Sequence, residues 1–427
     1  MREMKDSGIK WIGKIPKDFK LVKVKYELNH RNEKNMPIKS TDILSLTAKQ
    51  GVIPLSEKQG GGNKPKENYS AYKLAYPNDI VLNSMNILSG SVGLSKYFGC
   101  VSPVYYVFYL AEDKKDIRYY NYVFETKEFQ NSLFGLGNGI LIKESENGKF
   151  NTIRMRIPLD KFTDLVIPVA PYEEQKRIAC FLDVKCSEID LLIKNIQQQI
   201  FHLEEYKKSF ITEAVTQGLD KNRELKKSDI FYMAPYNCKW RLSKIGYECT
   251  KIVREFESTD IPLICTNKGK ISVRPPEMTG KMVSEDNAMQ GIKKGDIAIH
   301  GMDTWHGAIA LSEFDGKITR VVHVCQSKQD NRFIVYYLQQ LAFNGVYKLI
   351  SNGVRGNTSD FRSWEKVKNI YIALPSLDEQ ISISNYLDGK CTKIDSIIKT
   401  KKEQLSKLEE YKKSLIYECV TGKKEVL

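Results

Sequence analysis

The sequence has few of the features that mark a membrane protein or a disulfide framework. Its nine cysteines are odd in number and contain no C-x-x-C pair, so zinc and disulfides both lack their usual signature. The longest apolar run is the eight residues Val104–Ala111, which is too short to cross a bilayer, and no charged start followed by an apolar run opens the chain. We therefore expect no secretion signal, no membrane span and a reducing, cytoplasmic location.

Motifs for nucleotide chemistry are also missing. The chain contains no G-x-x-x-x-G-K-[ST] phosphate loop, and nothing in it supports ATP binding. The run Gly135–Gly139 is glycine-rich but lacks a following strand and acidic residue, so a flexible loop is favoured over a nucleotide cradle. An Asn-Pro-Pro-aromatic tetrapeptide, which an amino-methyltransferase needs to grip an extruded base, does not occur.

Metal-dependent catalysis has only weak candidates. His300 and His306 lie near Asp303 but have no third and fourth ligand at a suitable spacing. Glu57 and Asp79 are of a type common on protein surfaces and do not form a nuclease motif. We therefore predict a non-catalytic chain that binds no metal or cofactor, and keep an enzyme with an unrecognised site as an alternative.

Proline is absent, and glycine nearly so, from two stretches that are copies of each other. Residues 174–216 and 379–421 align without a gap at an offset of 205, with 23 identities in 43 positions, and Gly389 is their one glycine. A helix of about 45 residues is about 67 Å long at 1.5 Å per residue. Such a helix cannot bury an apolar stripe within one small domain.

The apolar residues of both stretches follow a heptad spacing, with alternating steps of four and three residues. Each helix therefore has a stripe that needs a partner. Because a globular segment separates the two copies, we predict an antiparallel coiled coil, with Cys186 and Cys391 as small buried residues. The seam residues we predict are Leu182, Ile189, Ile193, Ile196, Ile200, Leu203, Leu387, Ile394, Ile398, Leu405 and Leu408.

Three lysines, Lys207, Lys401 and Lys412, interrupt this seam. A polar residue in a seam can fix the register of a coiled coil. A lysine can also extend along the apolar surface and place its ammonium group in water. The second interpretation is favoured.

The segments that alternate with the helices also repeat, with more divergence. The motif NDIVLNSMN around Asp79 matches GDIAIHGMD around Asp296 at an offset of 217. Short alternating apolar runs predict strands, and Ile117–Leu133 and Arg332–Lys348 each predict a core-facing helix. The fold class is therefore α+β: two tandem α/β domains and two paired long helices, with a pseudo-two-fold repeat. The predicted boundaries are 1–171, 172–218, 219–375 and 376–427 for the first domain, first long helix, second domain and second long helix.

The net charge of +14 is carried by the two globular segments. The number of Lys and Arg residues less the number of Asp and Glu residues is 26 − 18 = +8 for residues 1–171 and 24 − 17 = +7 for residues 219–375. The same difference is 6 − 8 = −2 for residues 172–218 and 10 − 9 = +1 for residues 376–427. Two basic domains joined by near-neutral helices are typical of a protein that binds a polyanion at two places. A generally lysine-rich composition is the alternative.

The opening SGIKWIGKIPKDF, the strand motif NDIVLNS, the helix entrance PYEEQKRIACFLD and the downstream LEEYKKS resemble the specificity subunits of Type I restriction-modification systems. The resemblance covers essentially the whole chain. It implies that each domain is a target-recognition domain that reads one half of a bipartite double-stranded DNA target. It also implies that the helix pair sets the spacing and docks two methyltransferase subunits, with restriction subunits joining outside. S-adenosylmethionine, ATP and Mg would then belong to the partner subunits.

Base-reading residues are expected on the loops that differ between the two repeats. Lys and Arg hold phosphates or read guanine, and Asn or Gln reads adenine. The two domains would meet DNA about one helical turn apart, or slightly more. A coiled-coil scaffold that binds only proteins is the alternative. The candidates are Lys64, Lys66, Asn83, Asn86, Lys268, Arg274, His300, Arg355, Asn357 and Arg362.

Overall fold

The computed structural model divides the chain into two compact units. The first unit contains the described residues up to 137, together with 156–196 and 403–426, and the second contains those within 197–402. The division therefore cuts through both long helices. The structure describes residues 2–47, 50–58, 65, 67–137, 156–276, 278, 288–351 and 361–426.

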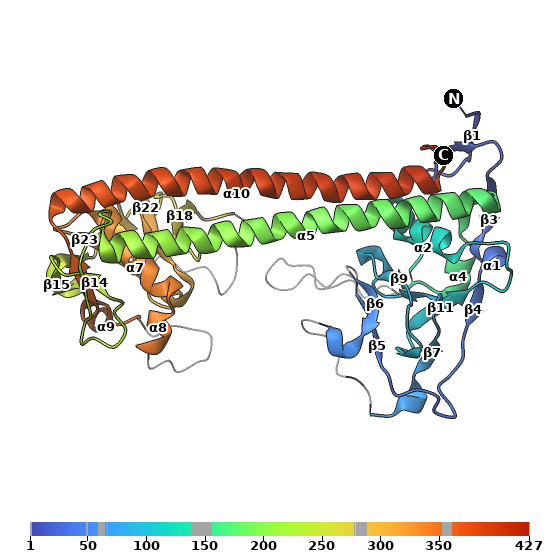
Figure 1. Ribbon diagram of the computed structural model, residues 1–427, viewed down its shortest axis with the longest axis horizontal. Helices are drawn as coiled ribbons and strands as arrows, with labels where there is room; N and C mark the ends of the chain where they lie inside the picture. The colour runs from blue at the N-terminus through green and yellow to red at the C-terminus, as the bar shows by residue number, and fades with distance from the viewer. Residues whose placement is uncertain are drawn as a thin grey trace. The chain divides into compact units, whose positions relative to one another are not determined.

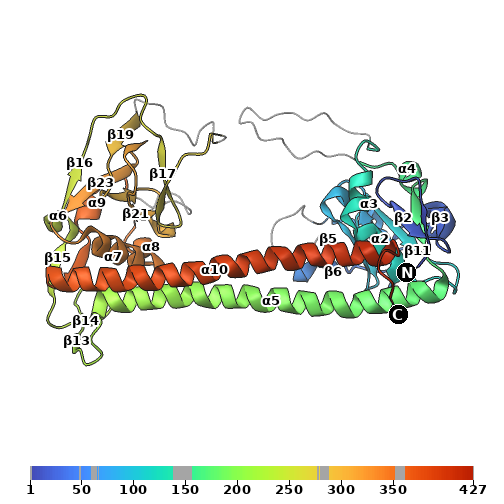
Figure 2. The ribbon, with the colours of Figure 1, turned by 90° about the horizontal axis from the view of Figure 1, so that it is seen from above.

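The two long helices, α5 (Tyr172–Gln217) and α10 (Leu377–Val420), contribute to both units. In the first unit the start of α5 lies beside the end of α10, and in the second the end of α5 lies beside the start of α10 (Figures 1 and 2). The predicted pairing of the long helices is therefore confirmed. None of the helices in the described residues is long and apolar enough to span a membrane.

The seam lysines bond across the helix pair. In the first unit the Lys412 Nζ donates to Asp190 Oδ1 at 2.6 Å, and in the second the Lys207 Nζ donates to Asp395 Oδ1 at 2.6 Å. Lys401 Nζ donates to Gln199 Oε1, also at 2.6 Å. In the second unit these contacts join later residues of α5 to earlier residues of α10, so the helices are antiparallel there. The favoured interpretation of the lysines as solvent-directed was wrong, because their side chains reach partners on the opposite helix.

The predicted seam positions face inward to different degrees. Leu182 and Leu387 have no exposed surface, and the isoleucines Ile189, Ile200, Ile394 and Ile398 are buried, as are Cys186 and Cys391. The remaining positions are half-buried. They are Ile193, Ile196, Leu203, Leu405 and Leu408.

Each unit is built on a four-stranded antiparallel sheet with the same order of strands. The first unit's sheet has the order β4-β11-β8-β9 and the second unit's has the order β16-β23-β20-β21. A shorter helix packs on each sheet's last strand, α2 (Ile117–Glu125) on β9 and α7 (Asn331–Phe343) on β21. The bounds are β4 (Asn29–Arg31), β8 (Ile80–Asn83), β9 (Val92–Leu94), β11 (Tyr105–Tyr109), β16 (Cys249–Ile252), β20 (Ile297–His300), β21 (Ile309–Leu311) and β23 (Val322–Ser327).

Two-stranded ladders surround each sheet, and they too correspond between the units. β3 (Lys20–Lys23) pairs with β12 (Val166–Val169), and β15 (Arg241–Lys244) pairs with β24 (Tyr371–Leu374), directly before each long helix. The other ladders are β1 (Met4–Asp6) with β2 (Lys14–Pro16), β5 (Leu44–Thr47) with β6 (Gly51–Pro54), β7 (Lys73–Ala75) with β10 (Gly99–Val101), β13 (Leu225–Lys226) with β14 (Tyr236–Asn237), β17 (Leu263–Thr266) with β18 (Lys270–Val273), and β19 (Met289–Ile292) with β22 (Gly316–Thr319).

The single core-facing helix predicted for each domain is wrong in its extent. In the first unit α2 (Ile117–Glu125) stops at Thr126, whose side chain accepts a hydrogen bond from Phe129 and caps α3 (Lys127–Ser132). Thr126 is extended, and its side chain competes with helical backbone bonding there. In the second unit α7 (Asn331–Phe343) ends before Gly345, and α8 (Val346–Leu349) follows.

Each domain is attached to its long helix by a repeated cluster of polar contacts. In the first unit, Arg118 Nη1 and the Tyr122 hydroxyl both donate to Asp183 of α5, each at 2.7 Å. In the second, Arg332 Nη1 and the Tyr336 hydroxyl donate to Asp388 of α10, at 2.9 and 2.7 Å. The aspartates occupy equivalent positions in the two copies of the helix. The attachment therefore has the same chemistry in both repeats.

One carboxyl group in this junction has no equivalent in the other repeat. Glu125, one turn after Tyr122, stands where the second repeat has Gln339. Burial raises the pKa of Glu125 to about 7, although the Asn121 amide donates to its carboxylate and Lys412 lies nearby. The contact of α2 with α5 therefore contains a carboxyl group that titrates near neutral pH, whereas the contact of α7 with α10 has an amide at the equivalent position.

Replacing two seam isoleucines by aspartate should open the helix pair. Ile193→Asp with Ile200→Asp removes apolar burial and places charge in the seam, so we expect the unfolding free energy to fall by about 3 kcal/mol or more. Thermal unfolding followed by circular dichroism measures this. The matched control, Asn195→Asp with Gln198→Asp, adds the same charge on exposed positions. A seam variant as stable as this control would contradict the seam.

Glu125→Gln should change how stability depends on pH. Between an unfolded pKa of about 4.5 and a folded pKa of about 7, the folded wild type binds more protons than the unfolded chain, so its stability falls as pH rises. The amide variant has no such loss. We expect it to be more stable than wild type above pH 7, on the order of 2 kcal/mol, and the difference to vanish toward pH 4.5. Urea unfolding across this range tests the prediction, with the exposed Glu112→Gln as control. Parallel pH profiles for wild type and Glu125→Gln would refute it.

Candidate nucleic-acid interface

The loops predicted to read bases are only partly described. Lys64, Lys66, Arg355 and Asn357 lie outside the described residues. The remaining six candidates are placed, and they fall into two groups. Asn83, His300, Asn86 and Arg362 lie at or next to the ends of β8 and β20, and Lys268 and Arg274 lie on the β17–β18 hairpin.

Asn83 and His300 have the same local role in the two repeats. Asn83 is buried at the end of β8, and its Oδ1 accepts the Met85 backbone N–H at 3.0 Å. His300 ends β20, and its Nδ1 accepts the N–H groups of Met302 and Asp303 at 3.3 and 3.1 Å. Both side chains therefore organise the turn that follows the strand. Base contact by either one stays a prediction.

The protonation state of His300 follows from these contacts. Burial lowers the pKa of His300, and the nearby Asp303 carboxylate opposes that shift without cancelling it. Because Nδ1 accepts two backbone hydrogen bonds, these contacts favour the neutral ring with its proton on Nε2. Among the described residues, no group of three side chains that could hold a metal ion converges here or elsewhere.

Asn86 and Arg362 are exposed, and each lies close to a turn residue. The Asn86 backbone N–H donates to the Asn83 carbonyl at 3.0 Å. Arg362 lies against Gly301, where an added Cβ would come within 2.9 Å of the Arg362 Cα. Only glycine permits this close approach. The structure therefore brings Arg362 next to His300.

Lys268 and Arg274 do not share a site. Lys268 lies in the turn of the β17–β18 hairpin, and Arg274 follows the end of β18 at its open end. Lys268 is exposed and Arg274 half-buried. These two residues could contact different phosphates but not the same one.

Asp79 corrects an expectation from the sequence. Its side chain is 2% exposed, not on the surface, and it accepts two hydrogen bonds from Arg31 at 2.8 and 3.1 Å. Arg254 and Asp296 form the equivalent pair in the second unit. Each pair joins the first strand of its sheet to the third. The carboxylate thus serves the fold.

The helix pair carries exposed apolar residues beside its interhelical ion pairs. In the first unit Leu192 and Tyr411 lie one or two residues from Asp190 and Lys412, and both are about half exposed. We call these two residues the first helix patch. In the second unit Ile397 and Tyr206 have the equivalent positions, beside Asp395 and Lys207, and form the second helix patch. Exposed apolar surface of this kind is common at protein interfaces.

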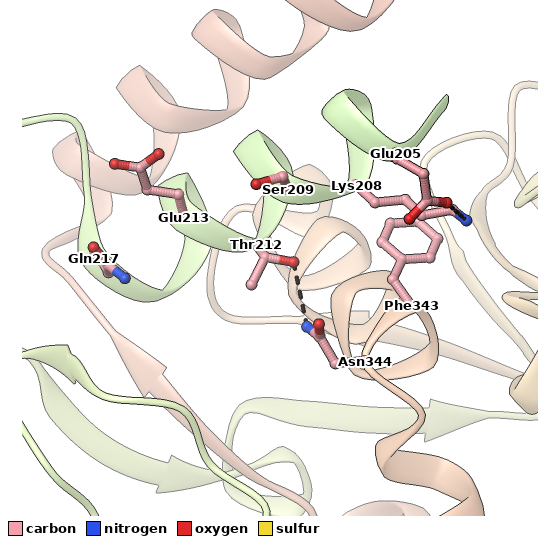
Figure 3. Close-up of a pocket in the computed structure, with 8 residues that line it drawn as sticks. All are labelled: Glu205, Lys208, Ser209, Thr212, Glu213, Gln217, Phe343 and Asn344. Atoms are coloured by element: carbon pink, nitrogen blue, oxygen red, sulfur yellow. Dashed lines mark hydrogen bonds and ion pairs between the residues drawn. The ribbon is translucent and has the colours of Figure 1, made fainter. Parts of the chain in front are cut away.

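An open pocket of about 560 Å³ lies in the second unit between the last turns of α5 and the end of α7. Its lining is largely polar, and the Asn344 amide donates to the Thr212 hydroxyl at 3.3 Å across it (Figure 3). In the first unit Tyr417, the equivalent of Thr212, donates instead to the carbonyls of Trp11 and Ile12. The N-terminal segment thus covers the helix face that stays open in the second unit. The lining residues are Glu205, Lys208, Ser209, Thr212, Glu213, Gln217, Phe343 and Asn344.

Comparison with solved structures decides the fold. A chain from a study of complex assembly and conformational transition of the type I R-M system aligns with a TM-score of 0.66 at 13% identity, covering 95% of this chain and 98% of that one. The HsdS subunit from Thermoanaerobacter tengcongensis aligns with a TM-score of 0.50 at 13% identity, covering 98% and 99%. This chain has the specificity-subunit fold.

Sequence relatives point to the same proteins. A proposed type I restriction enzyme MjaX specificity subunit from Methanocaldococcus jannaschii is 27% identical over 279 residues, which are 61% of this chain and 59% of that protein. The MjaVIII specificity subunit from the same organism is 26% identical over 281 residues, 61% and 63% of the two chains. The chain thus spans about three fifths of the length of these curated relatives. No family model matches. The resemblance to specificity subunits is confirmed.

Two basic residues of the first unit were not among the predicted DNA-binding residues. Lys73, in β7, is half-buried, and Arg156 is exposed beside the buried Ile157. No motif marks either residue. The signal that could have found Lys73 is the change of charge at its equivalent position, since Gln290 stands there at the offset of 217.

Proposed function

We propose that this chain is the DNA-specificity subunit of a type I restriction-modification complex. Each globular domain reads one half of a bipartite double-stranded target. The helix pair fixes the spacing between the half-sites and docks two methyltransferase subunits, and restriction subunits join outside them. The chain itself is non-catalytic, so S-adenosylmethionine, ATP and Mg bind to the partners.

The observation that carries this proposal is the repetition of one scaffold with two different surfaces. The sheets, the Arg–Asp pairs and the helix junctions match between the units. The turns at the ends of β8 and β20, by contrast, carry Asn83 in one unit and His300 in the other. A repeat that keeps its framework and changes its exposed loops is suited to two recognition events of different sequence. The fold and the relatives support the same assignment.

The helix patches support the docking of two partners. They are equivalent in the two repeats, so they offer two similar binding surfaces on one chain, as two identical partner subunits require. Exposed aromatic side chains are enriched at interface centres. The entrances of α5 and α10 differ, however, since Lys176 and Arg177 correspond to Ile381 and Ser382. The two docking sites are therefore similar but not identical.

Mapping adenine methylation tests the function as a whole. The chain is expressed with its cognate methyltransferase in a host free of adenine methylation, and each component is omitted in turn. We expect one bipartite motif that appears only when both are present. Absence of any motif, with the proteins shown to assemble, would favour a coiled-coil scaffold. Methylation by the purified chain alone would favour an enzyme.

Substitutions in the helix patches should separate docking from folding. Leu192→Asp and Ile397→Asp change exposed positions, so we expect the melting temperature to stay within a few degrees of wild type. Each should weaken methyltransferase binding at one site by at least tenfold, and together they should abolish the complex with two methyltransferases. Analytical ultracentrifugation measures the stoichiometry, with Asn195→Asp, which also adds a charge on an exposed face of α5, as control. Unchanged stoichiometry in the double variant would exclude the patches as docking sites.

A further inference from the structure

Lys73 is a half-buried cation whose ammonium group has a spare bonding capacity. Its Nζ donates to the Tyr105 carbonyl at 3.2 Å. An ammonium group carries three donors, so two remain without a partner among the residues that the structure describes. Within the described part of the chain, no carboxylate forms an ion pair with Lys73, whereas the arginines of the sheets, Arg31 and Arg254, are each paired with a buried aspartate.

Arg156 converges on the same end of the sheet. The neighbouring Ile157 donates its N–H to the Ser84 carbonyl at 3.0 Å and accepts the Tyr106 hydroxyl at 2.8 Å. Tyr105, whose carbonyl accepts the hydrogen bond from Lys73, precedes Tyr106 in the chain. It pairs with Asn83, the residue before Ser84. Burial, and then the positive charge of Arg156, lower the pKa of Lys73. The two cations therefore lie near the same end of the sheet, and among the described residues neither forms an ion pair with a carboxylate.

The second unit keeps the backbone contacts of this geometry and has an amide in place of the lysine. Gln290, the equivalent of Lys73, donates its amide to the Val322 carbonyl, which corresponds to that of Tyr105. Phe361 donates to the Gly301 carbonyl and accepts from His323, as Ile157 does with Ser84 and Tyr106. The residue before Phe361 is Asp360, which lies outside the described residues. The lysine is therefore not needed for the fold, because an amide fills its place.

We propose that Lys73 and Arg156 form an anion site that binds one backbone phosphate of DNA in the first half-site, and that the second domain, with Gln290, lacks the lysine of this site. This inference rests on the proposed function. The half-buried Lys73 and the exposed Arg156 repel each other, and a phosphate between the two groups supplies the missing negative charge. Asn83, which pairs with Tyr105, would then lie beside the bound phosphate backbone of the DNA. The two domains would hold DNA with unequal electrostatic contributions.

The test uses the full chain assembled with its methyltransferase, and double-stranded DNA that carries the target motif. Lys73→Gln copies the residue that the second unit already tolerates, and Arg156→Gln removes the second charge. Lys114→Gln, an exposed lysine near the start of α2, is the control. For each protein the dissociation constant is measured over a series of salt concentrations.

Losing one phosphate contact should reduce the slope of log K against log salt by about 0.9. We expect this for Lys73→Gln and Arg156→Gln, together with a several-fold loss of affinity, and no change for Lys114→Gln. Single phosphates of the first half-site are then replaced by neutral methylphosphonates. At one position this replacement should weaken DNA binding by the wild type and leave the affinity of Lys73→Gln unchanged. No such position should exist in the second half-site.

Wild-type slope and affinity in both variants would overturn the anion site while leaving the proposed function intact. Binding of inorganic phosphate to wild type and not to Lys73→Gln, with no coupled methylphosphonate position, would show a free-anion site and would overturn the assignment to DNA. A wild-type complex that fails to bind any DNA would overturn both proposals.

Discussion

The structure depends on the mutual burial of two apolar stripes along α5 and α10. Neither helix can cover its stripe with one domain alone, and the stripes have the same heptad spacing because the helices are copies. Buried residues such as Leu182 and Leu387 supply the apolar contact. The Lys–Asp contacts between the helices then fix which residues meet, because a shift of one turn would leave each aspartate without its lysine. Exposed ion pairs contribute little stability, so specificity of register is their larger effect.

The attachment of the domains to the long helices is likewise repeated in the two units. One aspartate at the equivalent position of each helix receives an arginine and a tyrosine from its own domain. Because these contacts are polar and directional, they fix the orientation of α2 or α7 on the helix. The remaining surface is free to vary without disturbing this junction. Divergence of Lys73 and Gln290, or of Glu125 and Gln339, therefore changes local charge while the framework is maintained.

The sequence predicted the long helices well because their signal is strong and local. Heptad spacing, the lack of proline and a repeat with 23 identities in 43 positions all favour the same element, and the repeat also implied the partner. The break at Thr126 was missed because a threonine that caps a new helix has the same sequence pattern as one within a helix. The lysines of the seam were misjudged because their choice between water and an aspartate depends on the register of the two helices.

The candidate interface was harder to predict, since exposure and partnership are tertiary properties. Asn83 and His300 have the residue types that read bases, yet their polar atoms are engaged by the backbone of their own turns. Asp79 has the composition of a surface residue and is buried beneath Arg31. Lys73 carries no motif, and its lack of a carboxylate partner in the described part of the chain becomes visible only when the ladder around Tyr105 is assembled. The pairing of side chains across strands, rather than any propensity, distinguishes these cases.

The distribution of the chain between the units has a consequence for synthesis on the ribosome. The described residues of the second unit fall within one continuous span, 197–402, whereas the first unit also needs residues 403–426. Leu415, Ile416, Cys419 and Val420 belong to the same core as Phe19 and Tyr119. That core can close only when residues 403–426 have emerged. The domain translated first is thus completed only after the second domain has been synthesised.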